Sequence, residues 1–228
     1  MTITTCVFDA YGTLFDVAGA ARSMAEQPGR EKFEKHWQKV ASDWRLKQLE
    51  YSWLRAVSNT HCDFWDVTKD GLDWALEASG FTNDPVLRED LLALYWELPP
   101  YPDGLRTLAL LKAQGFKTAI LSNGSKDMLD GAVTGAGLES LLDATLSVDD
   151  VAVFKPSRKV YDMVGDHFGC TSNEVLFVSS NGWDAAYAAH YGFITVWVNR
   201  MGLPMDRLPG TPTHVLSDLT TIPDLAKA

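Results

Sequence analysis

Residues 8–16 read FDAYGTLFD, and they follow an apolar run that begins at Ile3. A short run of β-branched and aromatic residues that ends in Asp and then Gly is typical of a buried strand leading into a turn. In open α/β sheets the ligand crevice lies just beyond the carboxyl ends of the strands. We therefore expect Asp9 to lie at the floor of such a crevice. The alternative is an Asp in an ordinary strand-ending turn.

Downstream of residue 99, apolar runs of strand length alternate with helical patterns that end at glycine. This alternation predicts an α/β fold with a doubly wound parallel sheet. The expected strands are 3–8, 117–121, 143–146, 175–178, 194–198 and 214–216, and the expected helices are 105–114, 126–136, 157–168 and 185–191.

The segment between the first strand and residue 98 has a helical pattern and contains most of the tryptophans. Apolar residues recur at helical spacing along it, and Leu54 and Val57 continue the apolar side of its first long helix. A cluster of prolines from residue 99 then breaks the pattern. We therefore expect an α/β core domain made of residues 1–16 and 99–228, and an inserted helical cap domain made of residues 17–98.

The composition excludes several classes of partner. The 228 residues carry a formal net charge of -10, which argues against nucleic acid and anionic membranes. We find no run of about 18 apolar residues that could span a membrane, and no signal peptide. The three cysteines are far apart and read as reduced packing residues, so we expect a cytoplasmic protein. The five histidines lack the spacing of metal ligands.

Three later stretches carry polar groups suited to handling an anion: LSNGS at 121–125, FKP at 154–156 and SSNGWD at 179–184. Together with FDAYGTLFDV at 8–17, and in this order, they resemble the haloacid dehalogenase superfamily. The closest resemblance is to its L-2-haloacid dehalogenase (type II) branch. It covers nearly the whole chain, including WRLKQLEYSWLR at 44–55. The resemblance implies a Rossmann-like core with an inserted helical cap.

The resemblance also implies that Asp9 is a covalent nucleophile, a role in which a carboxylate splits one hard step into two. Lys155 would keep that carboxylate ionised, and Asn181 and Asp184 would orient Lys155 or the hydrolytic water. Ser122 and its adjacent backbone, before a helix, would bind the substrate carboxylate. The implied catalytic set is Asp9, Thr13, Arg45, Ser122, Asn123, Lys155, Tyr161, Ser179, Asn181 and Asp184.

Arg45 and Asn123 would bind the departing halide, because a guanidinium and an amide offer several N–H donors. At position 46 the close relatives carry Gln, whereas this chain has Leu46. If that amide helps to bind halide, the preferred halogen of this chain is an open question. The substrate pocket implied by the family pattern is lined by Tyr11, Leu49, Phe64 and Trp183, together with Ser122 and Asn123.

Taken singly, these residues have ordinary structural alternatives. Ser122 and Asn123 could be plain helix caps, Lys155 a solvated surface lysine, and Tyr161 a packed helix residue. Phosphatases of the superfamily carry a second Asp two residues after the nucleophile and further acids late in the chain, for magnesium. In this chain Tyr11 stands at the position of the second Asp, and a Ser-Ser-Asn stretch stands where the late acids would be. Magnesium needs several hard oxygen ligands, so we expect neither a metal nor another cofactor.

We therefore expect a hydrolase that removes halide from short (S)-2-haloalkanoic acids and forms (R)-2-hydroxy acids through an aspartyl ester on Asp9. The resemblance also implies a homodimer. The alternatives are a magnesium-dependent phosphatase on the same fold and a non-catalytic binding protein with a relic site. Tyr11 argues against the first, and the joint presence of the polar set argues against the second.

Overall fold

The computed structural model describes residues 2–227, and its centre is a parallel sheet. Six strands pair in the order β3-β2-β1-β4-β5-β6. This is the strand order of a doubly wound Rossmann-like fold, so the expected fold class is confirmed. The strands are β1 (Thr5–Phe8), β2 (Lys117–Ser122), β3 (Ala144–Ser147), β4 (Val175–Ser179), β5 (Ile194–Val198) and β6 (His214–Leu216).

The central strand β1 fixes where the polar stretches meet. All four of its residues are buried, as expected for a strand that is covered on both faces. Phe8 lies opposite Ile120 of β2 and Val178 of β4 in the parallel register. The residues that follow these three strands therefore gather at one edge of the sheet.

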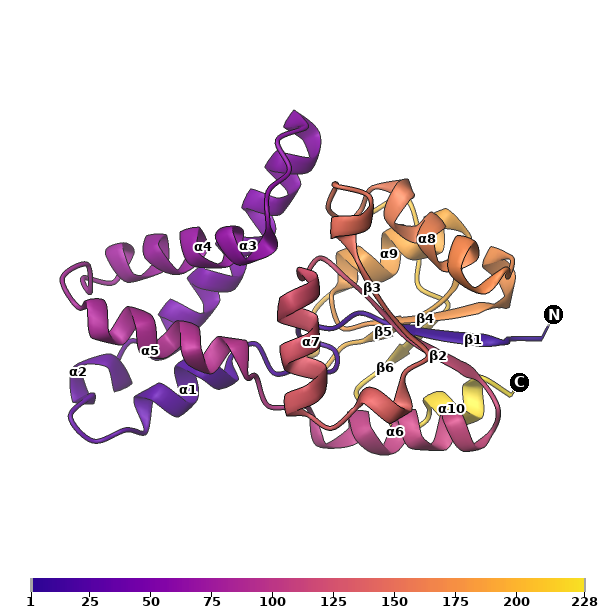
Figure 1. The fold of residues 1–228 in the computed structure, drawn as a ribbon, viewed down its shortest axis with the longest axis horizontal. Coiled ribbons are helices and arrows are strands. Elements are labelled where there is room, and N and C mark those ends of the chain that lie inside the picture. Colours follow the sequence, from indigo (N-terminus) through magenta and orange to yellow (C-terminus); the bar gives the residue numbers. More distant parts are fainter. Residues whose placement is uncertain (1, 228) are drawn as a thin grey trace.

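Helices cover both faces of the sheet (Figure 1). In this view α8 and α9 lie above the strands, and α6 and α10 lie below them. The core helices are α6 (Pro102–Ala113), α7 (Lys126–Gly135), α8 (Arg158–Phe168), α9 (Gly182–Tyr191) and α10 (Ile222–Leu225), with short 3-10 helices η1 (Glu139–Leu141), η2 (Val148–Asp150) and η3 (Ser172–Glu174).

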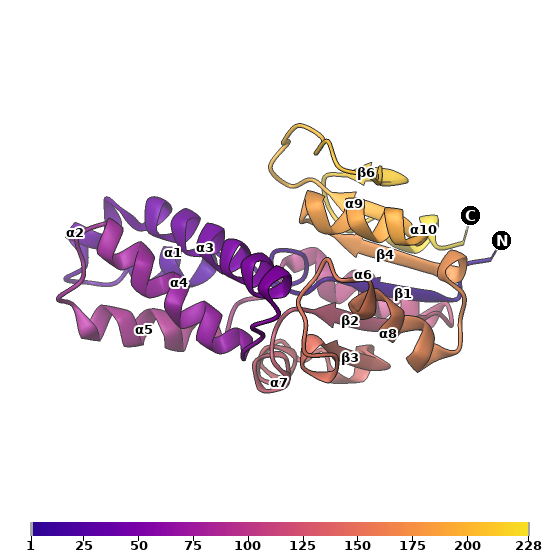
Figure 2. The same cartoon turned by 90° about the horizontal axis from the view of Figure 1, so that it is seen from above.

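Five helices form a separate layer beyond the carboxyl ends of the strands, and both chain termini lie at the opposite end of the molecule (Figure 2). The two connections to this layer lie side by side, since Asp16 donates its N–H to Pro99 at 3.0 Å. We propose residues 17–98 as the cap domain, with 1–16 and 99–228 as the core. The cap helices are α1 (Gly19–Ala25), α2 (Glu31–Glu34), α3 (Trp37–Ser58), α4 (Phe64–Ala78) and α5 (Pro85–Trp96).

Two helices begin three residues before their predicted starts. Helix α6 begins at Pro102, whose fixed φ suits a first helical position, and α9 begins at Gly182, inside the polar stretch. The expected apolar side of α3 is wrong at its end, because Leu54 is 59% exposed and Val57 is 84% exposed. The C-terminal turns of α3 extend past the other cap helices (Figure 1).

Candidate active site

Asp9 directly follows β1, and its side chain is 9% exposed. Its Oδ2 accepts from Asn181 Nδ2 at 2.7 Å and from Thr13 Oγ1 at 3.1 Å, and Ser179 Oγ approaches it at 3.5 Å. Its Oδ1 accepts from Lys155 Nζ at 3.1 Å. The two oxygens of one carboxylate are thus distinguished, because three donors face Oδ2 and an ammonium group faces Oδ1.

The ammonium group of Lys155 lies between two carboxylates and is 1% exposed. Its Nζ donates to Asp184 Oδ2 at 2.8 Å, and the Tyr161 hydroxyl donates to Asp184 Oδ1 at 2.8 Å. Burial alone would lower the pKa of Lys155, but Asp184 and Asp9 together raise it above its usual value. Burial raises the pKa of Asp184, although Lys155 opposes that shift. The arrangement holds a protonated lysine against Asp9.

The segment after β2 places a second group of polar atoms beside Asp9. Ser122 Oγ accepts from the N–H of Gly124 at 3.0 Å, and Asn123 Oδ1 accepts from the N–H of Lys155 at 2.9 Å. The second bond fixes the amide so that Asn123 Nδ2 is the group able to donate to a ligand. A Cβ at Gly124 would lie 2.7 Å from the Tyr11 ring, so the backbone approaches the pocket closely only with glycine there.

Arg45 reaches the core from the cap helix α3. Its Nη2 donates to the Tyr11 carbonyl and to Asn181 Oδ1, both at 3.1 Å. Asn181 therefore joins the guanidinium to Asp9 through opposite ends of one amide. Arg45 and Lys155 supply two positive charges at one site of a chain whose formal net charge is -10.

These groups enclose a cavity of about 10 Å³, which is room for about one water molecule. Tyr11 forms part of its apolar wall, stacked on Tyr95 with ring centroids 5.9 Å apart. Burial raises the pKa of Tyr11 well above its usual value, so its phenol stays neutral near pH 7. The lining residues are Asp9, Tyr11, Arg45, Leu49, Phe64, Ser122, Asn123, Lys155, Asn181 and Trp183.

All of these lining residues belong to the set expected from the sequence, and the structure brings them together. Thr13 and Ser179 lie behind them and contact Asp9, Asp184 contacts Lys155, and Tyr161 contacts Asp184, through the hydrogen bonds given above. The placement supports the predicted roles, which remain predictions.

Position 46 does not belong to this site. Leu46 is 54% exposed and is not among the residues that line the cavity. An amide at this position of α3 would therefore start from the solvent side of the helix. The hypothesis that Leu46 alters halide binding loses its geometric basis in this structure.

Sequence reasoning missed the residues that support Tyr11 and Thr13. Tyr95 is buried in α5, and its hydroxyl exchanges hydrogen bonds with Gln48 at 3.1 and 3.2 Å. Ser180 donates its N–H to Thr13 Oγ1 at 2.9 Å, which directs the Thr13 proton toward Asp9. Tyr95 and Gln48 lie at positions where the helical pattern of the cap predicts buried residues. The spacing of residues could therefore not show that they hydrogen-bond to each other.

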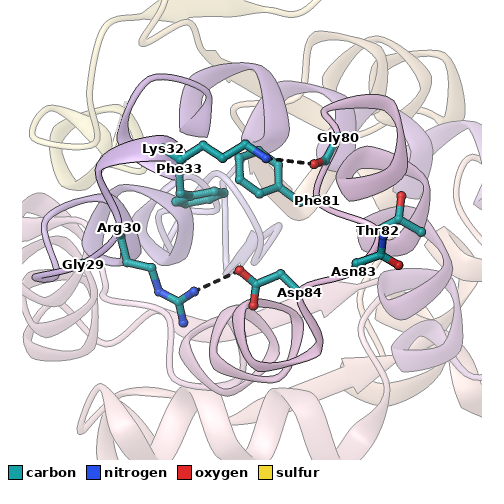
Figure 3. Close-up of a pocket in the computed structure, with 9 residues that line it drawn as sticks. All are labelled: Gly29, Arg30, Lys32, Phe33, Gly80, Phe81, Thr82, Asn83 and Asp84. Atoms are coloured by element: carbon teal, nitrogen blue, oxygen red, sulfur yellow. Dashed lines mark hydrogen bonds and ion pairs between the residues drawn. The ribbon is translucent and has the colours of Figure 1, made fainter.

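A wider cavity of about 460 Å³ lies at the far end of the cap (Figure 3). Arg30 lines it, but its guanidinium is paired with Asp84 at 3.2 Å and Asp90 at 2.7 Å. Lys32 donates to the Gly80 carbonyl at 3.1 Å. Its cations are thus engaged by the cap itself, and the catalytic set lies elsewhere.

Within residues 2–227, no group of three or more His, Cys, Asp and Glu side chains could hold a metal ion. The two carboxylates at the site, Asp9 and Asp184, both face Lys155 Nζ. An ammonium group therefore occupies the place between the acids. No helix in the same described range is long and apolar enough to cross a membrane.

Comparison with known proteins gives consistent matches. The family model described as haloacid dehalogenase-like hydrolase matches residues 3–192. (S)-2-haloacid dehalogenase 1 of Pseudomonas sp. (strain CBS-3) is 44% identical over 98% of this chain and 96% of its own length.

Two solved structures share the fold over nearly their full length. A dehalogenase solved with an intermediate complex has a TM-score of 0.93 at 37% identity, covering 100% of this chain and 98% of its own. The L-2-haloacid dehalogenase from Xanthobacter autotrophicus with chloropropionic acid covalently bound has a TM-score of 0.88 at 37% identity, covering 100% and 99%.

Proposed function

Since the chain belongs to the haloacid dehalogenase-like hydrolases, and within them to the (S)-2-haloacid dehalogenase branch, we propose that it hydrolyses short (S)-2-haloalkanoic acids to (R)-2-hydroxy acids. The observation that carries this proposal is the set of contacts to the two carboxylate oxygens of Asp9. Lys155 holds one oxygen, while Asn181, Thr13 and Ser179 face the other. A carboxylate positioned in this way can serve as a nucleophile.

In the first step, Asp9 Oδ1 attacks the α-carbon from the side opposite the halide. A carbon–oxygen bond forms as the carbon–halogen bond breaks, the configuration inverts, and the electron pair leaves with the halide. Oδ1 is the attacking atom because three donors already face Oδ2. Arg45 and Asn123 Nδ2 bind the leaving halide, which needs no proton.

In the second step, water attacks the carbonyl carbon of the Asp9 ester. Negative charge then develops on Oδ2, where Asn181 and Thr13 donate at 2.7 and 3.1 Å. Donors held in advance at the atom that gains charge are an effective form of catalysis. The bond from the carbonyl carbon to Oδ1 breaks, the hydroxy acid leaves with that oxygen and one proton of the water, the other proton passes to solvent, and the Asp9 carboxylate is regenerated. Asp184 acts as a positioning residue that holds Lys155.

The substrate carboxylate binds at Ser122 and at the backbone N–H groups that precede α7. Helix N-termini attract anions because their first N–H groups lack partners within the helix. The apolar wall of Tyr11, Leu49, Phe64 and Trp183 receives the alkyl group. A cavity of about 10 Å³ has room for about one water molecule and not for a 2-haloalkanoate, so the residues that line it must move apart when substrate binds.

We also propose a homodimer and a cytoplasmic location. Leu54 and Val57 are exposed apolar side chains near the free end of α3, a feature that supports contact with a second copy. The three cysteines, Cys6, Cys62 and Cys170, are all free, as is usual in a reducing compartment. No cofactor takes part in the proposed reaction.

The experiment that tests the function is an assay of free halide with each enantiomer of 2-chloropropanoate, before and after exhaustive chelation. We expect the (S) enantiomer to be consumed, (R)-lactate to form, and chelation to have no effect. Consumption of both enantiomers alike, or retention of configuration, contradicts the single displacement. Activity lost on chelation and restored by magnesium favours the phosphatase-type site.

A further inference from the structure

Arg45 and Asn181 line two cavities, the small active-site cavity and an outer cavity of about 350 Å³. We call the outer one the exit pocket, whose lining includes Val17, Arg45, Asn181, Arg200, Met201 and Leu203. It lies between the connection to α1 and the loop after β5. The two residues shared by both cavities therefore form the partition between them.

The partition is held by few interactions. Arg45 Nη2 donates to Asn181 Oδ1 and to the Tyr11 carbonyl, both at 3.1 Å, and Arg45 and Asn181 are half-buried. On the other sides, the cavity is closed by buried side chains such as Phe64, Ser122 and Lys155. Rotation of the Arg45 side chain would join the two cavities without moving these buried side chains.

The exit pocket can hold a small anion. Arg200 pairs with both oxygens of Asp103 at 3.0 Å and donates to the Thr13 carbonyl at 3.2 Å. These bonds engage three of its five N–H groups. Of the other two, the N–H at Nε is buried and has no hydrogen-bond partner within residues 2–227, and the second N–H at Nη1 belongs to a side chain that is 18% exposed and lines the pocket. Asp16 also lines the pocket, but Arg22 pairs with it. Weakly hydrated guanidinium groups beside apolar side chains suit a large, weakly hydrated monoanion.

The opposite side of the active site offers no such path. Trp183 separates it from an apolar pocket of about 330 Å³, whose lining includes Trp53, Val57, Pro156 and Leu208. None of the residues that line that pocket carries a charge. Burying an anion without a partner is strongly unfavourable, so we do not expect halide to leave past Trp183.

We propose that halide leaves the active site past Arg45 into the exit pocket, where Arg200 provides a second, transient anion site. The inference rests on the proposed dehalogenase function. Arg45, paired with the halide, turns away from Asn181 and Tyr11 and releases the ion beside Arg200. No covalent bond changes in this step, and the ester on Asp9 stays behind for hydrolysis.

The test is to fill the exit pocket with Leu203→Trp. Leu203 is 58% exposed, and it exchanges hydrogen bonds with the Asn199 side chain only through its backbone, at 2.9 Å each. A larger side chain can therefore be accommodated without loss of the loop structure. Met205→Trp is the matched control, because Met205 is exposed in the same loop but does not line the pocket.

Both variants are mixed rapidly with 2-bromopropanoate. Ester on the Asp9 peptide is followed by quenched-flow mass spectrometry, and free bromide by a halide-sensitive dye. In Leu203→Trp we expect ester to form at the unmodified rate and bromide to appear at least severalfold later. In Met205→Trp and the unmodified protein, bromide should appear together with the ester.

The outcomes separate the two proposals. If the unmodified protein forms neither ester nor bromide, the dehalogenase function itself is wrong. If it forms both, and Leu203→Trp releases bromide as promptly as Met205→Trp, the exit route is wrong. A delay produced by Val57→Trp in the apolar pocket, and not by Leu203→Trp, would also overturn it.

Discussion

Lys155→Met would leave two buried carboxylates without the cation that lies between them. In the native protein Lys155 Nζ is 3.1 Å from Asp9 and 2.8 Å from Asp184, and Lys155 is 1% exposed. Removing one partner of a buried ion pair typically costs about 3–5 kcal/mol, because the remaining charge is uncompensated. Domains of this kind unfold at a cost of about 5–15 kcal/mol, so the variant should fold with a much reduced stability.

The loss should depend on pH in a defined direction. Burial raises the pKa of Asp184, and Lys155 opposes that shift, so removing Lys155 raises the pKa further. A carboxyl whose folded pKa lies above its unfolded value binds its proton more tightly in the folded state. Protonation therefore stabilises the fold, and the deficit of Lys155→Met should be largest near pH 7–8 and shrink toward about pH 5.

Urea unfolding at several pH values measures this directly. The double variant Lys155→Met with Asp184→Asn is the matched control, because it removes one of the two uncompensated charges. It should recover part of the stability at neutral pH and none of the activity. Equal stability of Lys155→Met and the unmodified protein at neutral pH, with no dependence on pH, would refute the buried-charge interpretation.

Three further predictions concern activity. Arg45→Ala should fold and lose about a hundred- to a thousandfold in turnover, because one preorganised donor to the leaving group is gone; near-normal turnover would place the halide elsewhere. Leu46→Gln should leave the ratio of bromide to chloride release unchanged, since Leu46 is 54% exposed and outside the cavity; a shifted ratio would show that the side chain reaches the halide. On acidification, activity should fall while the circular dichroism spectrum stays native. The pKa of Asp184 is raised, so the folded protein can bind a proton at Asp184 without losing stability. Loss of activity and of the native spectrum at the same pH would contradict this prediction.

The fold could be predicted largely from the sequence because the strands are short apolar runs, and three of the four polar stretches, those that begin at residues 8, 121 and 179, lie at the end of one. The strand 214–216 was predicted at its observed bounds. The start of α5 also has a signal in the sequence, Asp84-Pro85, because Asp84 accepts from the N–H of Leu87 at 2.9 Å as a helix cap does. Helix starts at Pro102 and Gly182 were placed too late. The exposed end of α3 was missed because periodicity shows which residues share a face, not whether anything covers it.

The candidate site was predictable as a set of residues and not as a network. The end of the first strand placed Asp9 in the crevice, and the family resemblance added Lys155 and Asn181. It could not show that Asn181 donates to Asp9 while accepting from Arg45, since that depends on the orientation of one amide. Arg200 was not singled out, because its contacts to Asp103 and Thr13 join segments far apart in the sequence.

Oxygen tracing tests most directly whether Asp9 is the nucleophile. Excess enzyme is allowed a single turnover of (S)-2-chloropropanoate in water labelled with oxygen-18. The masses of the lactate and of the peptide that contains Asp9 are then measured by mass spectrometry. If Asp9 attacks the α-carbon and water later opens the ester, the lactate is unlabelled and the peptide carries the label. If Asp9 instead activates water for direct attack, the lactate is labelled and the peptide is not, which would contradict the nucleophilic role even if Asp9→Asn were inactive.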